Sequence, residues 1–210
     1  MAHRDAGSPL ILAPKTGHRR ADASGGAAGN ERLTAMTGAV LLALFAAEGV
    51  TLLSLHRLLT LHFFLGMLLV GPVVLKMATT GYRFVRYYTG AGLYLRKGPP
   101  ALVMRMLGPL VVITSLAVLA TGVALALAGP GRGQWLFLHK ASFVLWFGVM
   151  AIHVLVYAPR LPRLLARGPA TGRAAAVLGG RAARWLLLAA SLACGLLLAG
   201  LTLHLTARWA

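Results

Sequence analysis

Acidic residues are almost absent from this chain of 210 residues, which has four Asp and Glu against 21 Lys and Arg and a formal net charge of +17. Charged residues of both signs make up only 12%, about half of their usual share in soluble domains, whereas hydrophobic residues reach 58%. This balance excludes a water-soluble monomer. It also argues against a nucleic-acid partner, because the arginines lie between long apolar runs and not on a polar face.

Cysteine is nearly missing as well. The single residue, Cys194, excludes an internal disulfide and any Cys-based zinc or iron–sulfur site. The sequence also lacks a nucleotide-binding loop, a catalytic triad and a zinc motif. We therefore predict no catalytic residue, and self-contained hydride or hydrolytic chemistry is not expected.

Apolar runs of spanning length dominate the rest of the chain, since roughly 20 helical residues cross a bilayer. They predict an all-α, polytopic membrane helical bundle with about five transmembrane helices, the first four forming the core at 33–157. Residues 1–32 are expected to be a disordered polar segment, 158–184 a basic loop, and 185–210 the fifth helix with the C-terminus. The predicted helices are 34–55, 58–80, 106–128, 135–157 and 185–206.

The basic residues predict the orientation of these spans. The N-terminal segment and the 81–105 and 158–184 connections together carry 16 Lys and Arg, whereas the opposite side carries four. This positive-inside bias places the N-terminus in the cytoplasm and the C-terminus outside. The lipid bilayer is thus the first predicted partner.

Ionisable groups inside the spans are costly, so they are candidate functional residues. His139 and His153 are 14 residues apart on one predicted helix, which puts them on about the same face with about 21 Å between them. Two haems stacked across a membrane need axial ligands at this separation. His62 lies at the same depth as His139, near the outer face, so we predict that these two imidazoles ligate the iron of one haem.

The inner site leaves alternatives open, because Lys76 and Met77 stand where a second histidine would complete the symmetry. Met77 could ligate a second haem opposite His153. Met36, at the inner start of the first helix, could do so instead. Otherwise Lys76 and His153 bind a haem propionate, a quinone or a lipid phosphate without an inner haem.

The remaining polar groups are weaker candidates. Glu48, in the first predicted helix, is a candidate proton or quinone contact and has no obvious partner in the sequence. Lys140 could pair with a haem propionate, and His56 and His204 are outer-surface candidates. Among the small residues, Gly122, Gly148 and Gly195 (with Ser191) are predicted to allow close helix packing.

The stretch from 33 to 157 resembles the bacterial cytochrome b-561 superfamily, which includes the b-type membrane subunits of nickel–iron hydrogenases and formate dehydrogenases. The matching features are the run Leu-His-Phe-Phe-Leu-Gly at 61–66 and the run from Leu138-His139-Lys140 to His153. The family commonly has a further histidine at the inner end of its first helix, where this chain reads Leu-Thr-Ala-Met-Thr-Gly at 33–38. The resemblance implies haem b held between histidines, and electron exchange with quinone.

These features together predict an integral membrane b-type cytochrome of a bacterial cytoplasmic membrane. It would carry one haem b, or two if the inner site is a haem site, and would exchange electrons with a quinone and a redox partner protein. Such a chain could be the haem-bearing subunit of an oxidoreductase. The competing hypothesis is a haem-free transporter, or an anchor or assembly subunit of a larger complex.

Overall fold

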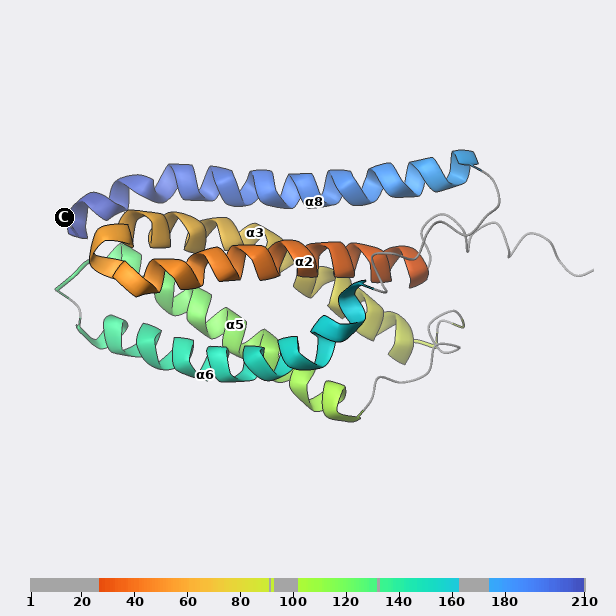
Figure 1. The fold of residues 1–210 in the computed structure, drawn as a ribbon, viewed down its shortest axis with the longest axis horizontal. Helices are drawn as coiled ribbons and strands as arrows, with labels where there is room; N and C mark the ends of the chain where they lie inside the picture. The colour runs from red at the N-terminus through yellow and green to blue at the C-terminus, as the bar shows by residue number, and fades with distance from the viewer. Residues whose placement is uncertain (1–26, 91, 93–101, 132, 163–173, 210) are drawn as a thin grey trace, which may run out of the picture.

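A computed structural model describes residues 27–90, 92, 102–131, 133–162 and 174–209, and every element in these ranges is helical (Figure 1). The prediction of an all-α bundle is confirmed. The long helices are α2 (Ala27–Thr51), α3 (Leu55–Tyr88), α5 (Leu102–Ala128), α6 (Gly133–Tyr157) and α8 (Ala174–Thr202). Short 3-10 helices are η1 (Leu52–Ser54), η2 (Ala158–Arg160) and η3 (Leu203–Trp209).

Four segments of the described chain are long and apolar enough to cross a membrane: Gly29–Tyr88, Arg105–Ala128, Gly133–Tyr157 and Gly180–Trp209. The first of them, at 60 residues, folds back on itself at η1, where the backbone of Ser54 leaves the helical region. It therefore supplies both α2 and α3, which pack side by side. The structure therefore has five long apolar helices, as predicted, and the protein is a membrane protein.

The helices extend further than their apolar runs. α2 already begins at Ala27, so the end of the segment expected to be disordered is helical, and the Asn30 side chain donates a hydrogen bond to the Thr79 carbonyl at 2.9 Å. α8 begins at Ala174, inside the expected 158–184 loop. Hydropathy marks only the residues in hydrocarbon, whereas a helix continues through the interface wherever its residues favour it. The predictions for 1–26 and 163–173 concern residues outside the described ranges.

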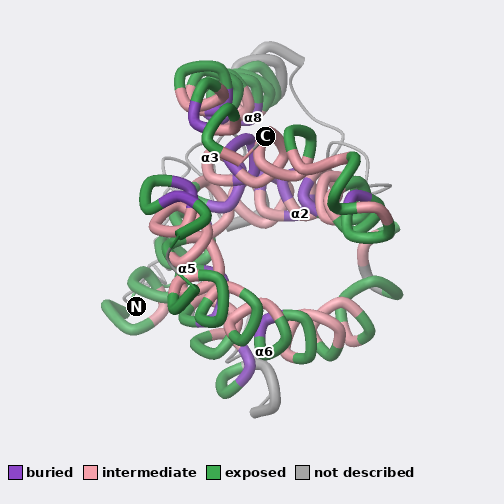
Figure 2. Tube along the Cα trace, turned by 90° about the vertical axis from the view of Figure 1, so that its left-hand side faces the viewer, coloured by how far each residue is buried: buried purple, intermediate pink, exposed green. Residues whose placement is uncertain are grey.

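Two helical hairpins, α2–α3 and α5–α6, surround a common interior, and α8 lies outside this ring against α3 (Figure 2). The contact between α3 and α8 is a close backbone approach. A Cβ on Gly71 would overlap the Ser191 carbonyl, and a Cβ on Gly195 would overlap the Leu68 carbonyl. The predicted packing role of Gly195 is confirmed. That of Gly148 is wrong, since nothing lies within 4 Å of its would-be Cβ.

Large apolar side chains face outward along the bundle. Leu53 is 85% exposed, Leu155 75% and Leu201 74%, and buried residues are few. An apolar surface of this extent suits lipid tails and not water. Polar groups inside the bundle therefore need a specific explanation.

Candidate functional site

His62 on α3 and His139 on α6 face each other across the interior, with their ring centroids 6.5 Å apart and their planes at 69°. The helices that carry them make little direct contact, because α6 packs mainly on α5 and α3 packs on α2 and α8. Side chains from two different hairpins thus meet at one depth. The structure brings together the two histidines that were predicted to form a pair.

The Nδ1 atom of His62 has two acceptors on α2. Glu48 Oε1 lies 2.9 Å from it, and Thr51 Oγ1 also lies 2.9 Å from it. Thr51 donates its own proton to the Glu48 carbonyl oxygen at 2.6 Å, so its hydroxyl oxygen accepts from the imidazole. We therefore assign the Nδ1–H tautomer to His62, which leaves Nε2 with a free lone pair.

Glu48 is the only Asp or Glu after residue 31, so the single acid of the apolar segments is the partner of His62. Its Oε2 atom is buried without a hydrogen-bond partner in the structure. Gly66, one turn after His62, lies beside this carboxylate, and a Cβ there would make an ordinary van der Waals contact with Oε1 at 3.6 Å. Glu48 had no partner visible in the sequence, and the fold supplies one.

His139 is oriented in the same way by the other hairpin. Its Nδ1 lies 3.3 Å from Thr121 Oγ1 on α5. Thr121 donates to the Ala117 carbonyl at 2.7 Å, which leaves its oxygen to accept the Nδ1–H of His139. A Cβ on Gly122 would lie 3.0 Å from His139 Cε1, so this glycine makes the space for the ring. The Thr121 hydroxyl also lies 2.9 Å from Ser142 Oγ, and the His139 ring has a further hydrogen-bond partner in the backbone of Val118.

The separation of the two ring centres can be compared with that of two imidazoles that would hold one metal ion between them. An iron between two imidazole nitrogens, with bonds of about 2 Å and about 1.2 Å from each nitrogen to its ring centre, separates the ring centres by about 6.4 Å. The observed separation is 6.5 Å. The planes rotate freely about the nitrogen–iron–nitrogen axis, so the 69° angle is compatible. A hydrogen-bonded second nitrogen on each ring is also the usual feature of metal-ligating histidines.

A layer of aromatic rings closes the interior below this pair. Trp146, two turns after His139 on α6, is buried and donates from Nε1 to Ser115 Oγ on α5 at 3.0 Å. Its ring lies 4.8 Å from that of Phe45 on α2. This layer connects the two hairpins and separates the histidine pair from the other end of the bundle.

At that other end, the structure brings Lys76 and His153 into one region. Lys76 Nζ donates to the Thr34 carbonyl on α2 at 2.7 Å and lies within electrostatic range of the His153 ring. The Nδ1 atom of His153 is buried without a hydrogen-bond partner in the structure, and the ring lies 4.7 Å from that of Tyr157. A buried ring nitrogen with no partner is a candidate contact for a polar ligand.

The other predicted candidates lie elsewhere. Met77 packs against the apolar cluster of Leu41, Leu69 and Val73, and Met36 is half-buried on α2. Lys140, His56 and His204 are exposed, and His204 Nδ1 is hydrogen-bonded to the Leu201 carbonyl of its own helix. None of these five residues makes a hydrogen bond, ion pair or ring contact with His62 or His139 in the described part of the chain.

In the part of the chain that the structure describes, no group of three or more His, Cys, Asp or Glu side chains gathers around a point where a metal ion could bind.

The sequence analysis missed the two threonines that orient the histidines. Their signal is positional. Glu48 and His62 are seven residues before and after residue 55 at the α2–α3 turn, with Thr51 one turn after Glu48, and Thr121 and His139 are nine residues before and after Pro130.

Comparison of the chain with protein-family models, curated proteins and solved structures finds no match. The chemistry of the site therefore has to be argued from its own residues.

Proposed function

We propose that this protein is an integral membrane b-type cytochrome, with haem b ligated by His62 and His139. The observation that carries the proposal is the opposition of two imidazoles from separate hairpins at 6.5 Å, each with its Nδ1 within hydrogen-bond distance of a side chain of its own hairpin. The two rings belong to helices that make little direct contact, yet they meet in the interior. An iron bound between them would account for this arrangement.

The bound haem would supply reversible one-electron chemistry. The chain's own residues hold and orient the two imidazoles, keep water away and set the local charge. Glu48 contributes a negative charge beside one ligand, whereas the hydroxyl of Thr121 is neutral beside the other. The two axial ligands therefore differ in basicity, the His62 side being the more electron-rich.

At the Lys76 end of the bundle, we assign the binding of quinone to His153 and Lys76. The unpartnered ring nitrogen of His153 can donate to a carbonyl oxygen. The ammonium of Lys76 has three donors, of which the Thr34 carbonyl takes one. Electrons would pass along the bundle between this region and a redox partner. The orientation proposed from the basic residues puts the Lys76 end and the N-terminus on the cytoplasmic side of a bacterial inner membrane.

The test is a dithionite-reduced minus oxidised absorption spectrum of detergent-purified protein, with haem quantified per chain. We expect the sharp α-band of six-coordinate haem b in the parent protein and loss of stoichiometric haem in His62→Ala and in His139→Ala. The matched control is His204→Ala, an exposed histidine near the same end of the bundle, which should keep the full haem content.

A parent protein without haem, after expression with adequate haem supply, would refute the proposal and favour the transporter or anchor hypothesis. Full haem content in both single variants would refute the ligand assignment while leaving a cytochrome. The two results are therefore distinct.

A further inference from the structure

A half-open pocket of about 250 Å³ lies between α2, α3 and α8, at the end of the bundle that holds Lys76. Leu33 and Leu187 form part of its wall, and the polar lining includes Asn30, Tyr82 and Arg184. The pocket thus combines an apolar wall with a charged edge. It is separate from the histidine pair, and no function has been assigned to it above.

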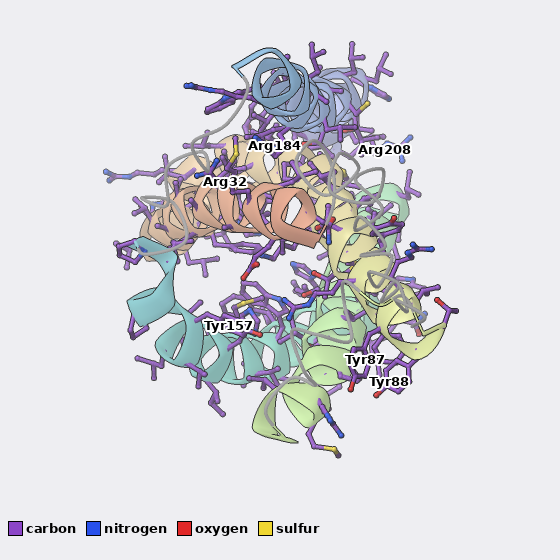
Figure 3. All side chains as sticks on the ribbon, turned by 90° about the vertical axis from the view of Figure 1, so that its right-hand side faces the viewer. Arg32, Tyr87, Tyr88, Tyr157, Arg184 and Arg208 are labelled. Atoms are coloured by element: carbon purple, nitrogen blue, oxygen red, sulfur yellow. The ribbon has the colours of Figure 1, made fainter. Side chains whose placement is uncertain are left out.

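Positive charge is concentrated at this edge. The Arg184 guanidinium lies against α2, where a Cβ on Gly29 would be 3.5 Å from Nη1. Arg32 on α2 and Arg181 on α8 are both within electrostatic range of Arg184. Figure 3, which looks along the bundle, labels Arg32 on α2 and Arg184 on α8. Glu31 is the one acid nearby in the sequence, so the cluster keeps a net positive charge.

The depth of the cluster matches that of lipid phosphates. Arg32 directly precedes the apolar run of α2 that starts at Leu33, and Arg184 directly precedes the run of α8 that starts at Trp185. Both side chains therefore stand at the boundary between hydrocarbon and headgroups. A guanidinium there can bind two phosphate oxygens at once, and like-charged neighbours gain from an anion placed between them.

We propose that this pocket, which Arg184 lines and near which Arg32 and Arg181 add positive charge, binds the headgroup of an anionic phospholipid. The phosphate would sit between α2 and α8, and the first part of an acyl chain would lie along Leu33 and Leu187. A zwitterionic lipid fits less well because its terminal cation would face the same arginines. Direct contacts between α2 and α8 are few, so the lipid would connect these two helices, whereas α8 already packs closely on α3.

The test measures lipid binding to the detergent-purified full chain by native mass spectrometry and by the shift in thermal unfolding, which rises with occupancy of a site on the folded state. The added probes are phosphatidylglycerol, phosphatidylcholine and soluble glycerol phosphate. We expect retention of phosphatidylglycerol and a raised unfolding temperature, with neither effect from the other two. The readout does not depend on haem, so its failure is separate from that of the proposed function.

Arg32→Gln/Arg184→Gln should weaken phosphatidylglycerol binding by tenfold or more, since each arginine near the headgroups contributes about fivefold. Arg32→Lys/Arg184→Lys keeps the charge and should retain most of the binding. Arg105→Gln makes the same kind of charge change at this end on α5, which does not line the pocket, and should bind as the parent does.

Equal retention of phosphatidylcholine would overturn the proposal. So would equally tight binding of glycerol phosphate, which would make this a site for a soluble phosphate. A loss in the Gln double variant no larger than that in Arg105→Gln would also overturn it.

Discussion

Replacing Glu48 by Gln tests how the buried carboxylate acts on the proposed haem. Gln has the same shape and keeps an oxygen that accepts the Nδ1–H of His62, so the ring should keep its orientation and the protein its haem. The negative charge is lost. Because that charge stabilises the oxidised iron more than the reduced iron, the reduction potential should rise.

The size of the rise follows from the geometry. The carboxylate oxygen is 2.9 Å from His62 Nδ1. With about 2 Å across the ring and an iron–nitrogen bond of about 2 Å, the charge lies about 7 Å from the iron. At an effective dielectric constant of about 20, a unit charge at that distance contributes about 2.4 kcal/mol, which is about 100 mV for one electron. The side chains of His62 and Glu48 are only 22% and 16% exposed, so water screens this interaction weakly.

The assay is a spectroscopic redox titration of the purified protein, with haem content measured on the same samples. Thr51→Val is the control, because it removes a neutral acceptor of the same Nδ1–H and should shift the potential much less. A Glu48→Gln potential within about 20 mV of the parent value, at full haem content, would refute the assigned electrostatic role. Loss of haem in Glu48→Gln would instead make the residue structural.

Two further substitutions test the spacing of the helices. Gly122→Ala places a methyl group 3.0 Å from His139 Cε1 and should displace the imidazole ring. Haem content should then fall severalfold, while the helix content measured by circular dichroism stays constant. Full haem content would contradict the role of Gly122 in making space for the ring. Gly195→Ala drives a methyl group into the Leu68 carbonyl and should lower the free energy of unfolding by about 1–3 kcal/mol, measured by unfolding in mixed micelles. Its control is Gly38→Ala, where the methyl group meets only the flexible end of Lys76 and the loss should stay near the value of one hydrogen bond, about 1 kcal/mol. Equal losses in the two variants would contradict a backbone-to-backbone crossing of α3 and α8.

The number and rough place of the spans could be predicted from the sequence, because the cost of leaving backbone groups unpaired in hydrocarbon forces apolar runs into helices. Their ends could not. α3 continues to Tyr88, past the predicted end at 80, and α8 begins at Ala174 and not at 185. Helix length beyond the hydrocarbon depends on local propensity and contacts, which hydropathy does not measure.

The opposition of His62 and His139 followed from equal depth, but the partners of these residues did not. Equal depth fixes the level of a residue along the membrane normal. It does not determine in which direction around the helix axis the side chain points. The α3–α8 crossing at Gly71 and Gly195 was out of reach for a related reason. A glycine in an apolar run shows that a close approach is permitted, and only the fold shows which backbone approaches.

The interhelical hydrogen bonds follow one rule that connects the fold to the site. In an antiparallel hairpin, residues equally far from the turn lie at the same depth. Glu48 with His62 and Thr34 with Lys76 are each symmetric about residue 55, and Thr121 with His139 is symmetric about residue 130.

Each hairpin therefore contains the group that orients its own histidine, independently of the other hairpin. The two hairpins contact each other at Phe45 with Trp146 and at a cluster beside the histidines, where Val123 and Ala126 of α5 pack with Phe63 and Met67 of α3. A ligand bound by both imidazoles would add a strong connection at that level. Binding of such a shared ligand should accordingly be coupled to the docking of the two hairpins, in addition to the packing of α3 on α5.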